Sequence, residues 1–318
     1  MAVYTHLGAE DFAGLVAEYD VGELVSAKGI AEGVSNSNWL IETTRGRYIL
    51  TMYERRIDTS QLPFFLGLLD HLARSGCAVP ATIHDRHGAS HRELQGKAVA
   101  LIEFLPGVSP TRPTPSQAEA VGSALARVHL AGQSFGERRI NDLAPKNTAA
   151  ILRSCDPAKL ADIDEQLSGI AERADTLVAR WPQSLPCSII HSDLFPDNVL
   201  MLDGTVSGMI DFYFAAFDMM AYDLAITHAA WCFDSDGRTF DQAVGKAIIQ
   251  GYEAIRPLTL EEREALPLLA QGACLRFVAS RAEDWLDTPA DAQVRRKDPV
   301  DFLRRWDFYT GKGAAAFA

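Results

Sequence analysis

The segment that most constrains this chain is a polar loop set between short apolar runs. It reads His191-Ser-Asp-Leu-Phe-Pro-Asp-Asn-Val-Leu200 and is followed by Met209-Ile-Asp-Phe212. The apolar run Cys187-Ser-Ile-Ile190 precedes it, and Asp203-Gly204 is typical of a tight turn between two further strands. The pattern predicts a buried strand, a polar loop and a β-hairpin, so the loop's side chains would be held at fixed positions.

Those polar residues have the types and the spacing that phosphoryl transfer requires. His191, Asp193 and Asn198 stand in the order H-x-D-x-x-x-x-N, and Asp211 ends the next apolar run. A carboxylate can orient a substrate hydroxyl, and an amide oxygen with a second carboxylate suits Mg²⁺. We predict Asp193 as the catalytic residue, Asn198 and Asp211 as metal ligands, and His191 as structural support. The alternative is that they are ordinary turn and capping residues.

The hydrophobic pattern separates a β-rich N-terminal part from a helical C-terminal part. Strands are expected near 23–30, 38–43, 47–52, 91–96 and 97–104, and helices at 9–19, 60–75, 116–132, 158–180 (one or a pair) and most of 221–318. The run Glu103-Phe-Leu-Pro-Gly107 breaks this pattern and predicts a hinge. We expect an α+β fold with a nucleotide-binding lobe at 1–104 and a catalytic, substrate-binding lobe at 105–318. The Ala-rich end after Gly311 is expected to fray.

Composition and missing motifs exclude several classes of protein. The net charge of −12 argues against nucleic acid and anionic membranes as partners, and no apolar run is long enough to span a bilayer. Five widely spaced cysteines and no signal-like start predict a reduced, cytoplasmic protein. The chain has no P-loop, no Rossmann G-x-G-x-x-G after a strand, no H-E-x-x-H and no G-x-S-x-G. An ATP-using enzyme of this sequence must therefore hold phosphates with another kind of loop.

The motif segment is similar to the catalytic loop of the aminoglycoside phosphotransferase and choline kinase group, which has the protein-kinase-like bilobal fold. Gly122-Ser-Ala-Leu-Ala-Arg-Val-His129 resembles that group's preceding helix, and Ile210-Asp-Phe212 with Ala221-Tyr-Asp-Leu-Ala225 resembles its metal-binding segment and structural Asp. Three further stretches are most similar to the bacterial homoserine kinases of threonine biosynthesis. They are Glu32 to Thr43, Tyr48 to Glu54, and Leu275-Arg-Phe277 with Ser280-Arg281.

The resemblance implies roles for further residues. ATP and Mg²⁺ would be the cofactors, and homoserine the small-molecule partner. The backbone of the hinge residues Glu103 to Leu105 would contact adenine. The phosphate loop would contain Gly33, Ser35, Asn36 and Ser37.

One departure from the group's pattern concerns the phosphate anchor. Kinase-like folds place a Lys on the third strand and a Glu on the following helix, but Thr51 stands at the Lys position and the helix at 60–75 contains no Glu. A buried Lys without a Glu partner would destabilise the fold, so it is consistent that the Lys and the Glu are absent together. We hypothesise that backbone N–H groups and the hydroxyls of Ser35 and Ser37 take over with magnesium. Arg55 or Arg56 is the alternative.

Fewer residues of the sequence bear on the identity of the acceptor than on the reaction. Arg276 and Arg281 are candidates to bind the substrate, because an Arg binds a carboxylate in a bidentate manner; the alternative is that each pairs with a surface acid. Choline, methylthioribose, hydroxylysine or an aminoglycoside are alternative acceptors. A pseudokinase that binds nucleotide and acts as a partner-binding module is the alternative of another class.

Overall fold

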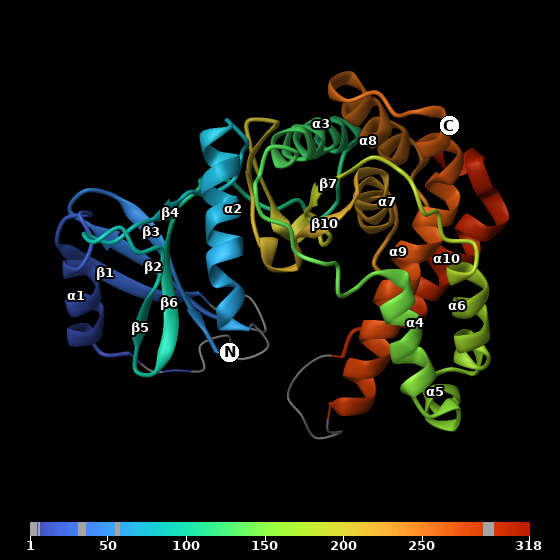
Figure 1. Ribbon diagram of the computed structural model, residues 1–318, viewed down its shortest axis with the longest axis horizontal. Coiled ribbons are helices and arrows are strands. Elements are labelled where there is room, and N and C mark those ends of the chain that lie inside the picture. The colour runs from blue at the N-terminus through green and yellow to red at the C-terminus, as the bar shows by residue number, and fades with distance from the viewer. Residues whose placement is uncertain (1–4, 6, 31–35, 55–57, 289–295) are drawn as a thin grey trace. The chain divides into compact units, whose positions relative to one another are not determined.

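The computed structural model describes residues 5, 7–30, 36–54, 58–288 and 296–318. Its first part is built mainly from strands (Figure 1). Its elements are α1 (Ala9–Ala17), β1 (Leu24–Ile30), β2 (Asn36–Thr43), β3 (Arg47–Tyr53), η1 (Thr59–Gln61), α2 (Leu62–Arg74), β4 (Thr82–Ile83), β5 (Arg92–Leu94) and β6 (Lys97–Glu103). The predicted strands and helices of this part are present, and the short β4 was not predicted.

The remaining elements are mostly helices. In chain order they are α3 (Pro115–Gly132), α4 (Pro145–Ser154), α5 (Pro157–Ile163), η2 (Glu165–Leu167), α6 (Ile170–Val178), β7 (Cys187–Ile190), η3 (Pro196–Asn198), β8 (Val199–Leu202), β9 (Thr205–Met209), η4 (Phe212–Phe214), β10 (Ala216–Met219), α7 (Met220–Trp231), α8 (Gln242–Ile255), α9 (Leu260–Asp287), α10 (Val300–Lys312) and η5 (Gly313–Phe317).

The N-terminal sheet has two apolar faces that are covered by different helices. Its strand order is β1-β2-β3-β6-β4, with β5 paired to β6. Along β3, Leu50 and Met52 pack with Phe12 of α1, whereas Tyr53 packs with Leu62 of α2. Because successive side chains of a strand point to opposite faces, α1 and α2 cover opposite faces of the sheet (Figure 1). From the sequence we expected a small sheet with one packed helix, and the structure packs a second helix, α1, on the other face.

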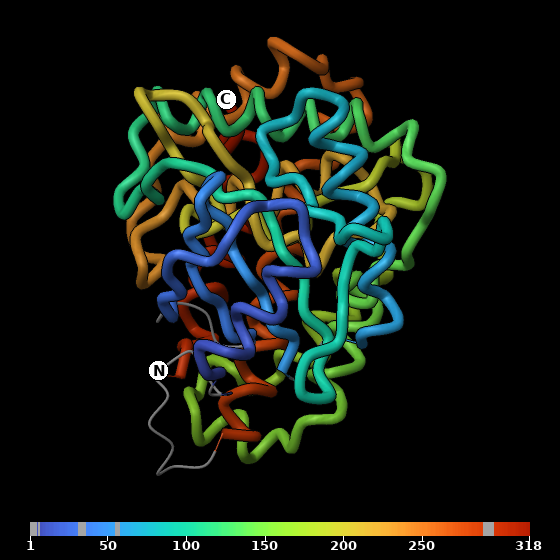
Figure 2. The backbone as a smooth tube through the Cα atoms, turned by 90° about the vertical axis from the view of Figure 1, so that its left-hand side faces the viewer, coloured from blue at the N-terminus to red at the C-terminus, as the bar shows by residue number. Residues whose placement is uncertain are grey.

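Tight turns connect the hairpins and fix the strand register. The β5–β6 hairpin, a narrow blue-green loop in Figure 2, turns at Gln95 (φ 51°) and Gly96 (φ 75°). The β8–β9 hairpin turns at Asp203 (φ 49°) and Gly204 (φ 78°), as predicted. Positive φ at both central residues matches the turn to the right-handed twist of the flanking strands.

The C-terminal helices surround α7, whose twelve residues are all buried. Helices α3 and α8 approach so closely that only glycine fits at their contact. A Cβ atom added to Gly122 would lie 2.1 Å from the Ile248 oxygen, and one added to Gly251 would lie 2.0 Å from the Glu119 oxygen. This backbone contact holds α3 in place before the predicted catalytic loop.

The C-terminal end differs from its prediction. Gly313–Phe317 forms η5, in which Ala316 is buried and the Phe317 ring stacks on Tyr309 at 5.7 Å. The expected fraying was wrong because the alanines end in an aromatic residue that packs on α10.

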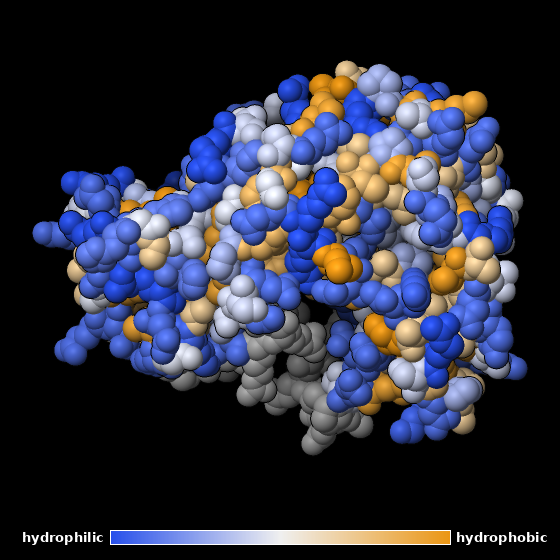
Figure 3. Space-filling model, in the orientation of Figure 1, coloured by the Kyte–Doolittle hydropathy of each residue, from blue (hydrophilic) through white to orange (hydrophobic). Residues whose placement is uncertain are grey.

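The chain divides into two compact units. The first contains residues 1–108, 200–202 and 207–213, and the second contains 109–199, 203–206 and 214–318. Figure 3 shows mostly hydrophilic side chains on the visible face of each unit, with hydrophobic ones in small separate groups. Within the described residues, no helix is long and apolar enough to cross a membrane.

Candidate active site

The polar loop begins where the buried strand β7 ends. β7 pairs with β10, and its residues Ile189 and Ile190 are buried. Ser192 follows with φ 71°, a left-handed conformation that is uncommon for a residue other than glycine. Such a conformation persists only where its surroundings hold it, so the contacts of this loop decide the direction in which Asp193 points.

Asp223 of α7 holds the start of this loop. The backbone N–H groups of His191 and Ser192 donate to its two carboxylate oxygens, both at 2.7 Å, and His129 Nε2 lies 3.0 Å from Oδ2. Burial alone would raise the pKa of the Asp223 carboxyl, but these hydrogen bonds and the nearby imidazoles lower that pKa below its usual value. Asp223 is thus an ionised, buried anchor for two loop N–H groups.

His191 lies inside the loop and away from solvent. It is fully buried, and its Nδ1 accepts a hydrogen bond of 3.2 Å from the backbone N–H of Asp193. Trp231 braces the same loop from α7, because its indole N–H donates to the Leu194 carbonyl at 2.9 Å. Trp231 is therefore a core residue that supports the loop, and its side chain is 2% exposed.

Asp193 and Asn198 lie together at the end of this supported loop. Asn198 Nδ2 donates to the Asp193 carbonyl at 2.8 Å and approaches its Oδ2 at 3.4 Å. This donation turns the amide oxygen of Asn198 away from Asp193, where it can serve as a hard ligand for a divalent cation. The Asp193 side chain is 20% exposed, so its carboxylate is held and can still meet a substrate.

Arg276 is the charged partner of this loop. Its Nη1 donates to Ser192 Oγ at 3.0 Å, and its Nη2 lies 3.4 Å from Asp193 Oδ1. Its guanidinium also lies over the rings of Phe214 (5.3 Å) and Phe277 (4.8 Å). The predicted substrate residue thus lies against the predicted catalytic residue, and two aromatic rings fix its plane.

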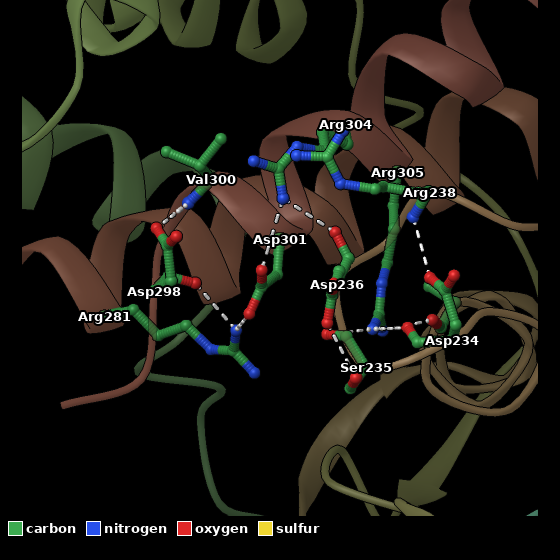
Figure 4. A network of polar contacts seen from close by, with 11 residues as sticks. Asp234, Ser235, Asp236, Arg238, Arg281, Asp298, Val300, Asp301, Arg304 and Arg305 are labelled. Carbon is green, nitrogen blue, oxygen red and sulfur yellow. Dashed lines mark hydrogen bonds and ion pairs between the residues drawn. The ribbon is translucent and has the colours of Figure 1, made fainter. Parts of the chain in front are cut away.

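Arg281, the second predicted substrate residue, lies on the same helix as Arg276 but belongs to a separate network of polar contacts (Figure 4). Its Nη1 donates to the Asp298 carbonyl at 2.8 Å and to Asp301 Oδ2 at 3.1 Å. Burial lowers the pKa of Arg281 to about 10, although Asp301 acts against that shift. These contacts attach α9 to the start of α10, beyond residues 289–295, so Arg281 has a structural role whether or not it also binds substrate.

Asp211 belongs to the first unit, while Asp193 and Asn198 belong to the second. Asp211 has φ 66°, so the segment that carries it turns sharply after β9. Two residues later, the Tyr213 hydroxyl lies 2.9 Å from the Tyr53 hydroxyl of β3. Burial raises the pKa of Tyr213 well above its usual value, and the Asp211 charge adds to this shift. The joint metal site of Asn198 and Asp211 remains a prediction.

The structure describes only some of the predicted nucleotide-binding residues. Gly33 and Ser35, and the alternative anchors Arg55 and Arg56, lie outside the described residues. Asn36 and Ser37 begin β2 and are buried. Glu103 ends β6 and accepts a hydrogen bond from the Ala81 N–H at 3.1 Å, and the half-buried Leu105 lies against Gly208. Their nucleotide contacts remain predictions.

The sequence analysis missed an ion pair between Glu54, which follows β3, and Lys97, which begins β6. Glu54 also accepts hydrogen bonds from Ser37 Oγ at 2.7 Å and from Thr5 Oγ1 at 3.0 Å. The hydroxyl of Ser37, which we predicted to contact phosphate, is therefore bound to Glu54. The pair was missed because its partners lie 43 residues apart in the sequence.

Comparisons with known proteins identify the family of this chain. A family model described as "Phosphotransferase enzyme family" matches residues 26–258. The homoserine kinase of Xanthobacter autotrophicus is 46% identical over 316 residues, which cover 99% of this chain and 98% of that protein. The homoserine kinase of Gluconacetobacter diazotrophicus is 48% identical over 315 residues, which cover 97% of each chain.

Solved structures with much lower identity have the same fold. A spectinomycin phosphotransferase in complex with ADP and spectinomycin aligns with a TM-score of 0.73 at 16% identity, over 98% of this chain and 100% of that chain. An amicoumacin kinase in complex with AMP-PNP, Ca²⁺ and Ami aligns with a TM-score of 0.73 at 13% identity, over 97% and 95%. The chain therefore belongs to the phosphotransferase enzyme family, with the protein-kinase-like fold predicted from its sequence and with homoserine kinases among its relatives of nearly full length.

Proposed function

We propose that this chain is an ATP- and Mg²⁺-dependent kinase that converts L-homoserine to O-phospho-L-homoserine in threonine biosynthesis, in the cytoplasm. The observation that carries the chemistry is the supported loop, in which Asp193 is held by Asn198 and Arg276. The observation that carries the acceptor is the identity of 46–48% with homoserine kinases over almost the whole chain. A fold alone would not select an acceptor, because one fold serves many reactions.

In the proposed reaction, the Asp193 carboxylate accepts a hydrogen bond from the hydroxyl of homoserine and points its oxygen at the γ-phosphorus. The bond from this oxygen to phosphorus forms while the bond from phosphorus to the β–γ bridging oxygen breaks. The hydroxyl proton passes to Asp193 and then to solvent, and ADP leaves. Because such transition states are loose, orientation by a rigid loop contributes more than a strong base.

The two predicted metal ligands have the chemistry that a magnesium ion prefers. Asn198 offers an amide oxygen that faces away from Asp193, and Asp211 offers a carboxylate, so both are the oxygen ligands that Mg²⁺ prefers. When bound, Mg²⁺ would neutralise charge on the β- and γ-phosphate oxygens. We further propose that the loop at 33–37 binds phosphates and that Glu103 to Leu105 contacts adenine.

Arg276 is our first candidate for the homoserine carboxylate. Its two terminal nitrogens each have one contact in the loop, and each carries a second N–H for a ligand. An arginine shared between Asp193 and the substrate carboxylate would place the acceptor hydroxyl near the catalytic carboxylate. Arg281 remains a second candidate, although its described contacts are structural.

A panel of alcohols tests the proposal, with ADP release as the readout and mass spectrometry of the product. The panel contains L-homoserine, choline, methylthioribose, hydroxylysine and an aminoglycoside, each with ATP and Mg²⁺. We expect kcat/KM for homoserine to exceed the others by roughly 100-fold, since a site built to bind polar groups rejects compounds that lack them. Equal or better turnover of another alcohol would replace homoserine as the acceptor.

The absence of Lys from β3 and of Glu from α2 favours one alternative of another class, a nucleotide-binding module without catalysis. The same panel distinguishes it, since such a module would bind AMP-PNP and release no ADP with any acceptor.

A further inference from the structure

The face of the N-terminal sheet that α2 covers carries an uncharged polar cluster. It consists of Asn36 and Asn38 of β2, Thr51 and Tyr53 of β3, and Tyr213. In the β2–β3 register, Asn38 pairs with Thr51 and Asn36 with Tyr53. Tyr53 and Tyr213 pack with the α2 residues Leu62 and Leu66, and the alternation of side chains places the two asparagines and Thr51 on this same face. We call these five residues the neutral cluster.

A chain of polar contacts joins the neutral cluster to the segment of Asp211. Thr51 Oγ1 donates to Asn38 Oδ1 at 2.9 Å, and Tyr213 forms a hydrogen bond with Thr51 and lies 2.9 Å from the Tyr53 hydroxyl. Tyr213 is two residues after Asp211, and the Asp211 charge acts on both tyrosines. Asp211 would help to hold the metal that neutralises phosphate charge, so we expect the phosphates to lie near this face.

The charged pair nearby lies on the opposite face. Residues two apart in a strand lie on the same face. Glu54 is two residues from Met52 and Lys97 is two residues from Val99, and both Met52 and Val99 pack with α1. Lys97 also donates to Thr5 Oγ1 at 2.6 Å, just before α1. This ion pair is therefore not a displaced copy of the usual Lys–Glu anchor, and the α2 face of β2 and β3 has neutral donors where the lysine would stand.

Asn38 has the right geometry to be such a donor. Because Thr51 donates to its Oδ1, the amide orientation is set and both N–H groups of Nδ2 are directed away from Thr51. Asn38 is only partly buried, so a ligand can reach it. Asn36, one pleat away on the same face, is 8% exposed, and its Oδ1 has no partner among the described residues. An amide flip would present its NH₂ group there.

We propose that the side-chain amide of Asn38, oriented by Thr51, donates hydrogen bonds to the phosphate oxygens of the nucleotide, with Asn36 as a second amide. The contacts of Thr51 with Asn38 and Tyr213 hold this donor in register with the Asp211 segment. Asn38 is a nucleotide-binding residue in this scheme, and Thr51 and Tyr213 are positioning residues. The inference rests on the proposed function only in that the ligand is a nucleoside triphosphate.

Titration of the full chain with AMP-PNP and Mg²⁺ tests this proposal without any acceptor. We expect Asn38→Ala to raise the Kd about tenfold, as loss of hydrogen bonds to charged groups does, and Asn38→Asp to raise it further by repelling phosphate. Thr51→Val keeps the side-chain volume but releases the amide, and is expected to raise the Kd about threefold. The kcat at saturating ATP should fall less than threefold in Asn38→Ala.

Asn147→Ala is the matched control, because Asn147 is an exposed asparagine whose amide donates to the Asp142 carbonyl in the other unit. Its Kd is expected to stay within twofold, and thermal melting checks that each variant is folded. Values within twofold for folded Asn38→Ala and Asn38→Asp would overturn the proposal. If Asn38→Ala does not fold, the isosteric Thr51→Val decides, and an unchanged Kd there would overturn the positioning role. An acceptor other than homoserine would overturn the proposed function and leave this result standing.

Discussion

The catalytic loop and the neutral cluster hold their polar groups in opposite ways. In the loop, charges make the contacts: Asp223 accepts from two backbone N–H groups, and Arg276 contacts Ser192 and Asp193. In the neutral cluster, hydroxyls and amides contact one another. If Asp193 orients the acceptor hydroxyl as we propose, charge is placed where a substrate oxygen must be oriented. If the cluster binds phosphate, it does so through neutral donors beside a cation.

Asp193→Ala should have the largest effect on kcat of the variants considered. A smaller effect would contradict the contrast between the loop and the neutral cluster. We expect kcat to fall roughly 1,000-fold or more while the Kd for AMP-PNP stays within a few-fold, because in our proposal the carboxylate acts on the acceptor hydroxyl and not on the nucleotide. Steady-state kinetics and nucleotide titration measure both values. Asp197→Asn, an exposed carboxylate of the same loop, serves as the control and should keep its activity. An unchanged rate in Asp193→Ala would remove this residue from the mechanism.

Asp223→Asn tests whether the loop depends on a buried charge. We expect the free energy of unfolding to fall by about 3–5 kcal/mol, because the amide keeps only one acceptor oxygen and its NH₂ group faces a buried N–H donor in place of the other. Denaturant unfolding measures this change.

The pH dependence of that variant gives a second test. Folding lowers the pKa of Asp223. Its contribution to the free energy of unfolding is therefore complete above the usual aspartate pKa, and is lost as the pH falls through the lower pKa of the folded state. The unaltered protein should therefore lose stability on acidification below about pH 4, and Asp223→Asn should lack that part of the loss. Equal acid sensitivity of the two proteins would contradict an ionised Asp223.

Arg276→Met is expected to lower kcat/KM for homoserine by about 10- to 100-fold, because a lost arginine contact to a charged group costs about 1.5–3 kcal/mol. The separate parameters distinguish its two proposed roles. A fall in kcat indicates positioning of Asp193, and a rise in KM for homoserine indicates binding of its carboxylate. Arg263→Met is the matched control on the same helix, since Arg263 pairs with Glu253 at the surface. No change in either parameter would remove Arg276 from the site.

Lys97→Met sharpens the comparison between the two faces of the sheet. Breaking its pair with Glu54 should lower the free energy of unfolding by about 1–2 kcal/mol, less than for a fully buried pair because 34% of the Lys97 side chain is exposed. The Kd for AMP-PNP should stay within twofold, since the pair lies on the α1 face. A large loss of nucleotide affinity would indicate that the phosphates are held on the α1 face, and it would contradict our placement of their donors on the α2 face.

The conformation of the loop at 191–200 could be predicted because its signal is local, whereas its catalytic role remains a prediction. The spacing of Asp193 and Asn198 and the apolar strand before them specify one loop, and the positions of these two residues follow from a few neighbouring residues. Contacts between distant segments could not be predicted in this way. Arg276 reaches Asp193 across 83 residues of sequence, and a helical pattern gives no information about which acid it meets.

The sequence also did not predict which face of the sheet each polar side chain of a strand occupies. Ser37 is one residue from Asn36 and Asn38, yet its hydroxyl is bound to Glu54 on the opposite face. A shift of one residue exchanges the faces, so a polar run such as Ser35-Asn-Ser-Asn38 does not say which members meet a ligand. The alternation of Leu50 and Met52 with Thr51 supplies that information only once the covering helices are known.

A crossed measurement of Asp193→Ala and Asn38→Ala tests the division between the two regions most directly. Both variants are measured for kcat with homoserine and for Kd with AMP-PNP and Mg²⁺, under the same conditions. The account predicts that Asp193→Ala loses kcat by roughly 1,000-fold and keeps its Kd, and that Asn38→Ala loses about tenfold in Kd and keeps most of its kcat. Loss of the same quantity in both variants would contradict separate roles for the charged loop and the neutral cluster.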